Sequence, residues 1–354
     1  MPMTAPGTTV PDEPPASAAP GLTITCVNPL EHAEEIKRLF LAHDRPEFPA
    51  FFDRAYADAV AAGTRSWIGR DSAGRIRAHI AWFPRWVAFD GKVLRAALLG
   101  NLMVATPYRR FWPALALVRR AVRDLRQSGS LDFVYADPNE TATPVLTTAG
   151  LRGVGSLQRF VLPLTDRRSA VAIGIRIYHL LGRLQAGTTT LTMSERLASD
   201  DPEPTDLQPR DDPRSLRPIR TASLYRARLG EYPDSRDRWY TFHLADAAAT
   251  EVGRALVRGP DHRGFAVICA LQWEPTSALP AILIALSRRL RESGATRLEV
   301  SLMAASSAAR ALRRAGFLPR ADRLPVLAVA FTERGTDAVL SASEWRILPV
   351  DLDR

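Results

Sequence analysis

Residues 145–151 read Val-Leu-Thr-Thr-Ala-Gly-Leu, and residues 311–317 read Ala-Leu-Arg-Arg-Ala-Gly-Phe, 166 positions later (150 to 316). Each segment has the pattern of a helical turn closed by glycine, the residue most often found just past a helix end. The flanking segments keep this offset, pairing 132–136 with 298–302 and 98–104 with 264–270. The sequence therefore predicts a duplicated α/β domain.

The hydrophobic pattern around the first copy alternates between strand and helix. A helix is expected after residue 111, because Leu115, Val118, Val122 and Leu125 recur at spacings of three and four. Turns at 71–74 and 90–91 separate successive strands. The predicted order is strand, two helices, three antiparallel strands, helix, strand, helix and strand, near residues 22–27, 32–43, 51–62, 65–69, 75–86, 94–104, 111–126, 132–136, 141–148 and 157–164.

Changes in composition along the chain suggest four segments. Residues 1–21 are rich in Pro, Ala, Thr and Ser, without the apolar middle of a signal peptide, and we interpret them as a disordered tail. Residues 22–165 form the N-terminal lobe, and residues 166–214 form a connecting helix and a polar linker. Residues 215–354 form a second, degenerate lobe. The fold class is α/β with a mixed sheet.

The composition excludes several classes of protein. Apolar residues make up 46% and charged residues 24% of the 354, so wholesale disorder and a fibrous fold are excluded. No segment approaches the roughly 20 apolar residues of a membrane span. The net charge is +9 and is carried almost entirely by arginine, but no zinc-ligand spacing or helix-turn-helix motif accompanies it. We therefore expect no nucleic-acid partner and no membrane insertion.

The chain has two cysteines, Cys26 and Cys269. They are too few to build a metal cage and lie far apart in sequence, which favours free thiols over a disulfide. We predict a cytoplasmic protein without a bound metal.

The order of elements and two motifs resemble the GNAT superfamily of acyl-CoA N-acyltransferases. Leu102-x-Val104-x-x-Pro107-Tyr108-Arg109 is similar to the family's fourth strand and pyrophosphate loop. Asn139-x-x-Ala142-x-x-Val145-Leu146-x-x-Ala149-Gly150-Leu151 is similar to its Asn-x-x-Ala to Gly-Phe segment. The resemblance covers residues 22–164 and, more weakly, 215–332. It implies two tandem lobes, acetyl-CoA or another acyl-CoA as co-substrate, and a small amine as acceptor. Tandem proteins with Gly-Pro-Ala-Leu where this chain has Trp112-Pro113-Ala114-Leu115 are associated with bacterial surface polysaccharides, so an amino-sugar is one candidate acceptor.

The resemblance implies a coenzyme site between the strands 98–104 and 132–136. A loop that runs into a helix presents unpaired N–H groups and a positive dipole end, which suit a pyrophosphate. The expected coenzyme-binding residues are Val104, Tyr108, Arg109, Arg110, Phe111, Trp112, Ala114 and Asn139. Asn139 also suits a helix N-cap, and both roles can hold. Asn101, in an otherwise apolar strand, is predicted to contact substrate, the alternative being a hydrogen-bonded core residue.

Attack of an amine on a thioester needs a proton acceptor and a proton donor. The candidate acceptors are His79, Asp137 and Glu140. The tyrosine that often serves the family as acid is replaced by Leu146 in the first lobe and Leu312 in the second. Trp112 stands where the family pattern has glycine, and Pro113 has no N–H. These departures leave a second interpretation open, a non-catalytic GNAT-like protein that binds a ligand or acts as a scaffold.

The second lobe has neither the loop arginine nor the asparagine. Ala305 stands at the position that corresponds to Asn139, and Glu274-Pro275-Thr276-Ser277 occupies the loop. We expect this lobe not to bind coenzyme A.

Overall fold

The computed structural model describes residues 22–109, 111–164, 191–197, 214–220, 237–245, 250–274, 276–342 and 344–347. The predicted tail at 1–21 and the predicted connecting helix lie outside the described residues. One part of the predicted linker is a strand instead, because β7 (Leu191–Leu197) pairs with β9 (Arg238–Leu244) at the edge of the sheet. Leu191 and Met193 alternate along β7 and both pack on the core, and this alternation is typical of a half-buried strand.

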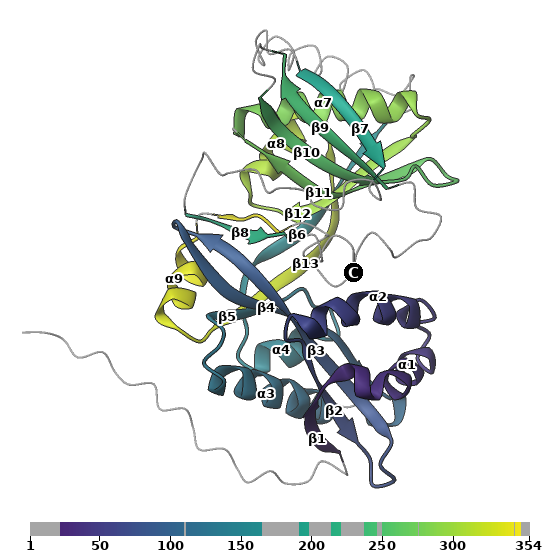
Figure 1. Ribbon diagram of the computed structural model, residues 1–354, viewed down its shortest axis with the longest axis vertical. Coiled ribbons are helices and arrows are strands. Elements are labelled where there is room, and N and C mark those ends of the chain that lie inside the picture. The colour runs from purple at the N-terminus through teal and green to yellow at the C-terminus, as the bar shows by residue number, and fades with distance from the viewer. Residues whose placement is uncertain are drawn as a thin grey trace, which may run out of the picture.

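The N-terminal half follows the predicted order of elements (Figure 1). Its elements are β1 (Thr23–Val27), α1 (Ala33–Leu41), α2 (Phe48–Ala61), β2 (Arg65–Arg70), β3 (Ile76–Phe89), β4 (Lys92–Val104), α3 (Phe111–Gln127), β5 (Phe133–Ala136), α4 (Thr143–Thr148) and β6 (Arg152–Pro163). A short 3₁₀ turn (Thr106–Tyr108) joins β4 to α3.

The C-terminal half repeats the central part of this order. After β7 and β9 it contains β10 (Glu251–Arg258), β11 (Phe265–Trp273), α7 (Leu279–Glu292), β12 (Arg297–Met303), α8 (Ser307–Arg314) and β13 (Leu318–Ala330). The other elements are β8 (Ser215–Ile219), α9 (Glu333–Ser341) and β14 (Glu344–Trp345). No helix of the described ranges is long and apolar enough to cross a membrane.

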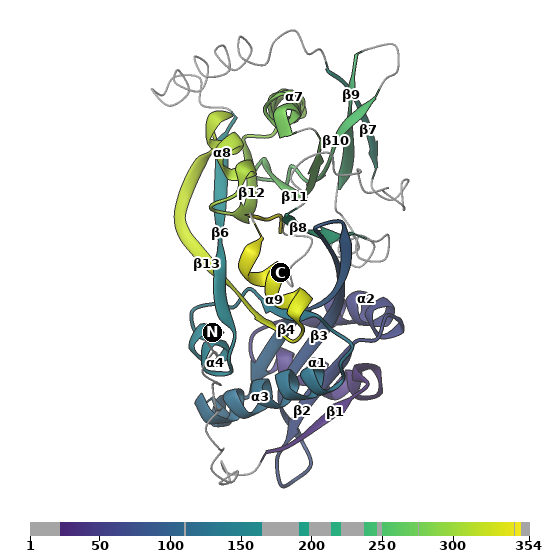
Figure 2. The ribbon, with the colours of Figure 1, turned by 90° about the vertical axis from the view of Figure 1, so that its left-hand side faces the viewer.

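The strands form one sheet whose order is close to a palindrome, β1-β2-β3-β4-β5-β13-β6-β12-β11-β10-β9-β7. At its centre the two halves exchange strands, because β13 lies between β5 and β6, and β6 lies between β13 and β12. Figures 1 and 2 show β6 and β13 side by side between the two lobes. Each lobe therefore contains a strand from the other half of the chain.

The repeated glycines occupy equivalent helix ends. Gly150 has φ 102° and Gly316 has φ 86°, the left-handed conformation that glycine adopts without strain. Each donates its N–H to the carbonyl three residues back, at 3.0 Å and 3.1 Å respectively. The same helix ending at the same offset supports the duplication.

Helices cover both faces of the N-terminal half of the sheet (Figure 2). Ile36, Phe40 and Phe52 of α1 and α2 pack in one apolar cluster with strand residues such as Phe83. Leu115, Val118 and Val122 of α3 pack in a second cluster on the other face, with Trp67 and Ile80. The spacing of three and four in α3 therefore marks the buried face of that helix.

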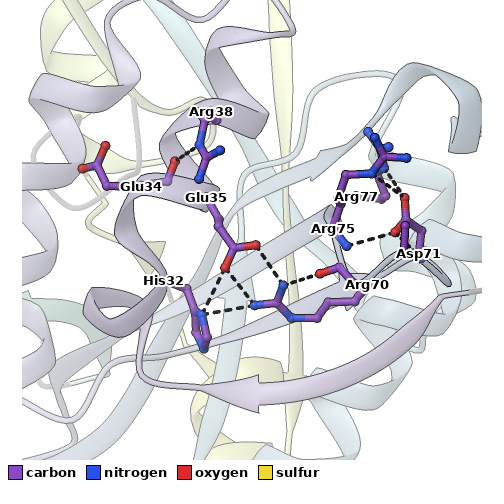
Figure 3. Close-up of polar contacts among 10 residues, drawn as sticks. His32, Glu34, Glu35, Arg38, Arg70, Asp71, Arg75 and Arg77 are labelled. Atoms are coloured by element: carbon purple, nitrogen blue, oxygen red, sulfur yellow. Dashed lines mark hydrogen bonds and ion pairs between the residues drawn. The ribbon is translucent and has the colours of Figure 1, made fainter.

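Ion pairs link α1 to β2 and stabilise the β2–β3 turn (Figure 3). Arg70 of β2 donates to both carboxylate oxygens of Glu35 in α1, at 2.8 and 3.0 Å, and lies 3.2 Å from His32 Nδ1. The hydrogen bond from Arg70 lowers the pKa of Glu35. At the turn, Asp71 accepts from Arg77 at 2.7 Å and lies 3.5 Å from Arg75. These contacts hold the hairpin beside the helix layer that covers β3.

Candidate active site

The sheet opens between β4 and β5. These parallel strands pair only through Ala96–Leu98 and Phe133–Tyr135, although β4 continues to Val104. The last six residues of β4, 99–104, therefore have no partner on β5, and the sheet is open beyond the last pair, Leu98 with Tyr135. Ligands of open α/β sheets bind at such carboxyl ends.

A β-bulge distorts β4 beside this opening. His79 pairs with Met103 and Ala81 with Gly100, so β4 has one residue more than β3 between these pairs. Asn101 in the bulge has φ 55°, a left-handed conformation that asparagine tolerates better than most residues. Its side-chain amide donates to Tyr56 Oη at 2.9 Å. A bulge leaves a backbone N–H out of the ladder and often lies next to an active site.

His79 lies inside the protein rather than in the opening. It has no exposed surface, its Nδ1 is 3.0 Å from Asn101 O, and its Nε2 is 3.0 Å from Ser66 Oγ. Because a carbonyl can only accept, Nδ1 carries the proton and Nε2 accepts from the serine hydroxyl. Burial lowers the pKa of His79 to about 4. This placement favours a role in positioning the bulge over the predicted role as a proton acceptor that touches substrate.

The loop after β4 places several predicted residues together. Arg109 is exposed and donates from Nε to the carbonyl of Val104 at 3.1 Å. The Arg77 guanidinium lies 6.0 Å from the centre of the Tyr108 ring. Arg110 lies outside the described residues. The basic loop therefore closes over the end of β4, with Arg109 accessible to an anion.

The first turn of α3 carries two exposed aromatic side chains. Phe111 is 40% and Trp112 is 65% exposed, large values for rings of this size, and the rings meet edge to face at 5.9 Å. Pro113 is buried against the core, and Ala114 is half-buried. Proline is at ease in a first helical turn, where its missing N–H has no intrahelical partner.

Polar residues follow β5 at the carboxyl end of that strand, next to the opening between β4 and β5. Asn139 accepts from the N–H of Ala142 at 2.9 Å through Oδ1, so its side chain caps the turn that leads into α4. Asp137 is half-buried, whereas Glu140 is exposed and lines an open pocket together with Thr143 and Thr147. Leu146 is buried in the core, so α4 presents no acid at that position.

Sequence reasoning missed three side chains around this site. Tyr56 and Ser66 are the hydrogen-bond partners that hold Asn101 and His79. His43 is half-buried after α1, with Nδ1 3.4 Å from Thr106 Oγ1. Burial, aided by the Arg109 charge, lowers the pKa of His43 and so favours the neutral imidazole. Gly100 and Asn101 interrupt an apolar strand, and this interruption could have indicated the bulge. The sequence around His43 does not indicate that His43 lies next to Thr106 and Arg109.

The loop after β11, which corresponds to the loop after β4, carries no arginine or lysine at 274–278. β11 pairs with β12 only through Phe265–Ile268, so the sheet opens here as well. The loop that follows carries Glu274, which is buried against Arg346 at 3.3 Å. Among the described residues no cluster of His, Cys, Asp and Glu could hold a metal ion.

The fold is similar to that of several solved N-acyltransferase structures. A probable N-acyltransferase from Enterococcus faecalis has a TM-score of 0.61 at 13% identity, over 91% of this chain and 75% of that chain. A GCN5-related N-acetyltransferase from Anabaena variabilis also has a TM-score of 0.61, at 10% identity, over 90% of this chain and 75% of that chain.

A third neighbour is the GCN5-related glucosamine N-acetyltransferase region of a fungal multi-domain β-N-acetylglucosaminidase. Its TM-score is 0.53 at 14% identity, over 90% of this chain and 39% of that chain. No protein-family model matches the sequence. No curated protein matches it either. The chain therefore has the fold of GCN5-related N-acetyltransferases, with two tandem lobes joined through exchanged central strands.

Proposed function

We propose that this protein is an N-acyltransferase that moves an acyl group from acetyl-CoA or another acyl-CoA to a small amine. The observation that carries the proposal is the opening between β4 and β5, which lies beside the basic loop and the amino end of α3. Only the N-terminal lobe, residues 22–165, combines these features among the described residues. In our proposal the second lobe, residues 215–354, binds no coenzyme A.

The coenzyme pyrophosphate would lie over residues 108–112. The N–H groups of Tyr108 and Arg109 are already donated to the carbonyls of Ala105 and Thr106, so the N–H groups of the first turn of α3 and the positive end of its dipole are what favour an anion at this point. Arg109 would exchange its bond to the Val104 carbonyl for a charge-assisted bond to phosphate, the stronger of the two kinds. Arg110 would add a second cation. The exposed rings of Phe111 and Trp112 would cover the ligand, and Asn139 and Ala114 would border it.

The reaction would be direct attack of the amine on the thioester carbonyl. The new N–C bond forms as the C–S bond breaks, and the sulfur leaves with the electron pair of that bond. A backbone N–H released by the bulge at Asn101 would stabilise the developing oxyanion. His43, Asp137 or Glu140 would accept the proton of the attacking nitrogen. With Leu146 in place of an acid, the departing thiolate would take its proton from water.

An amino-sugar is the acceptor that we favour. The glucosamine acetyltransferase region of the fungal neighbour and the resemblance to polysaccharide-associated enzymes both support it. We place the reaction in the cytoplasm, a reducing compartment in which thiols such as those of Cys26 and Cys269 persist.

The residues at three positions of the proposed site support a second candidate function, ligand binding without catalysis. The bulky Trp112 and the missing N–H of Pro113 reduce the donors available to a pyrophosphate, and Leu146 supplies no acid. Such a protein would bind a ligand in the same opening and transfer nothing.

Acetyl-CoA binding to an Arg109→Ala variant, measured by calorimetry, tests the site. Loss of a charge-assisted hydrogen bond is worth roughly 1.5 to 3 kcal/mol, or about ten- to a hundredfold in affinity. Arg126→Ala, an exposed arginine on α3 whose guanidinium lies over Phe331, is the matched control and should bind normally. If both variants bind like the unmodified protein, the proposed site is wrong. Mass spectrometry with acetyl-CoA and glucosamine then separates the two functions, because only a transferase forms the N-acetyl product.

A further inference from the structure

A chain of buried hydrogen bonds runs from β2 through β3 to the bulge of β4. Ser66 of β2 and His79 of β3 have no exposed surface, and the Ser66 hydroxyl lies 3.0 Å from His79 Nε2. His79 Nδ1 lies 3.0 Å from the carbonyl oxygen of Asn101. Fully paired buried networks rigidify the segment to which they bind. Here that segment is the bulge beside the proposed active site.

The last acceptor of this chain fixes the direction of each hydrogen bond. The Asn101 carbonyl can only accept, so Nδ1 of His79 carries the proton of the neutral ring. Nε2 is then unprotonated and accepts from the Ser66 hydroxyl. Burial, which lowers the pKa of His79 to about 4, keeps the ring neutral and preserves this direction. Ser66 thus favours the tautomer of His79 that holds the carbonyl.

The side chain of Asn101 holds the bulge at a second point. Its amide donates to Tyr56 Oη at 2.9 Å, and Tyr56 of α2 is fully buried. Asn101 has φ 55°, a conformation that residues other than glycine keep only where the surrounding structure supports it. The carbonyl and the side chain of Asn101 are therefore both fixed by buried partners, and the peptide after Asn101 has one orientation.

Fixing the Asn101 carbonyl also fixes the N–H of Leu102. The two groups belong to one trans peptide, in which the carbonyl and the N–H point in opposite directions. Since the carbonyl points to His79 of β3, the Leu102 N–H points away from β3. β5 is the neighbour of β4 on the other side, and its ladder with β4 ends at Leu98. The Leu102 N–H is therefore directed toward the opening between β4 and β5.

We propose that Ser66 and His79 are positioning residues that hold the Leu102 N–H in place as the hydrogen-bond donor to the thioester carbonyl. This inference rests on the proposed function, because it names the donor that stabilises the oxyanion of that reaction. When the amine attacks, negative charge develops on the carbonyl oxygen, and a donor that is already in place stabilises it without reorienting. Ser66 and His79 act through the backbone and do not touch the substrate.

The tautomer of His79 is the first measurement, and it requires no acyl-CoA. In ¹⁵N-labelled protein, couplings between the ring protons and the ring nitrogens identify which nitrogen is protonated. We expect a neutral ring with the proton on Nδ1. A ring protonated on Nε2 overturns the proposal, because the Asn101 carbonyl would then have no donor.

Infrared spectroscopy of bound acetyl-CoA, labelled with ¹³C at the thioester carbonyl, reports on the proposed donor directly. A hydrogen bond to this carbonyl moves its stretching band to lower wavenumber, and no amine acceptor is needed. The unmodified protein should show the shift on binding. Ser66→Ala should reduce the shift and His79→Gln should abolish it. The Kd of acetyl-CoA, measured by calorimetry, should change by less than about threefold, because the contacts to the pyrophosphate remain.

Two more variants separate positioning from a general loss of stability. His79→Asn keeps an amide donor at about the place of Nδ1 and should retain most of the shift, whereas glutamine carries its amide near the place of Nε2. Ser287→Ala is the matched control, because Ser287 of α7 is also buried and donates its hydroxyl to the Leu283 carbonyl. It should leave the shift unchanged. Transfer to glucosamine should have a kcat about a hundredfold lower in His79→Gln, with little change in the KM of acetyl-CoA.

The inference is overturned if acetyl-CoA binds and its carbonyl band is the same in the unmodified, His79→Gln and Ser66→Ala proteins. Equal reductions in Ser66→Ala and Ser287→Ala also overturn it, since that pattern reports loss of stability alone. If the unmodified protein binds no acetyl-CoA, the proposed function is refuted and this inference with it. If His79→Gln does not fold, Ser66→Ala is the deciding variant.

Discussion

The buried histidine of β3 should make the protein lose stability in mild acid. His79 is neutral in the folded state because it is fully buried and both ring nitrogens are hydrogen-bonded. Its pKa falls from 6.5 to about 4 on folding. The unfolded chain therefore binds a proton between these two pH values that the folded protein does not bind, so folding stability decreases as pH falls through this window.

The magnitude follows from the two pKa values. The difference between 6.5 and about 4 is worth about 3 kcal/mol when the pH lies below both values. Between pH 7 and pH 5 most of the unfolded chains become protonated at His79 while the folded protein does not, which gives a loss of about 2 kcal/mol. Few carboxylates titrate in this upper part of the window, so histidines dominate it.

The assay is urea denaturation of the unmodified protein and of His79→Gln at both pH values. The variant should be less stable at pH 7 because it loses hydrogen bonds, but its stability should fall by about 2 kcal/mol less on going to pH 5. His43→Gln is the control for the other histidine whose pKa is lowered. If the unmodified protein and His79→Gln lose the same free energy of unfolding, the neutral, buried histidine is refuted.

Other substitutions probe the bulge, the helix ends and the exchanged strands. Asn101→Ala should lower the free energy of unfolding by about 2 kcal/mol and Asn101→Gly by about 1, because only alanine is strained at φ 55° while both lose the bond to Tyr56. Gly335→Ala should cost about 3 kcal/mol in urea denaturation, since its Cβ would lie 2.0 Å from the carbonyl oxygen of Asp132. Gly316→Ala should cost about 1 kcal/mol and leave circular dichroism unchanged. Residues 22–165 alone should show no dispersed NMR spectrum, because β5 and β6 lose the strand between them.

Much of the fold could be predicted because its signals are local. The face of α3 is encoded in spacings of three and four, and the glycine at each helix end is encoded in one position of the repeat. The strand at 191–197 was missed because it lies among Thr, Ser and Pro-rich segments that obscure its alternation. The exchange of β6 and β13 has no local signal, since pairs such as Gln158 with Arg323 depend on contacts between distant parts of the chain.

Only those parts of the candidate site that lie within one strand, loop or helix turn could be predicted from the sequence. The loop Val104–Arg109 and the cap formed by Asn139 follow from short motifs, and they come directly after β4 and β5, the two strands that border the opening. The burial of His79 could not be predicted from its strand alone. It depends on Phe40 and Tyr56, which helices α1 and α2 pack against the imidazole at ring distances of 5.6 and 6.3 Å.

The exchange of β6 and β13 explains why the two halves resemble each other most at the centre of the sheet. In the centre of the sheet, Gln158 pairs with Arg323 and Leu157 with Leu324. Adding the repeat offset of 166 to Gln158 gives Leu324, and subtracting it from Arg323 gives Leu157, so each pair is the repeat equivalent of the other. The two halves are therefore related by a local twofold axis between these pairs. Each of these strands must fit both lobes at once, which restricts how far either can change. The loops after β4 and β11 face no such requirement, and there the chain has Arg109 in one lobe and Glu274 in the other. The chemistry of the two lobes can therefore differ while the sheet that joins them keeps its symmetry.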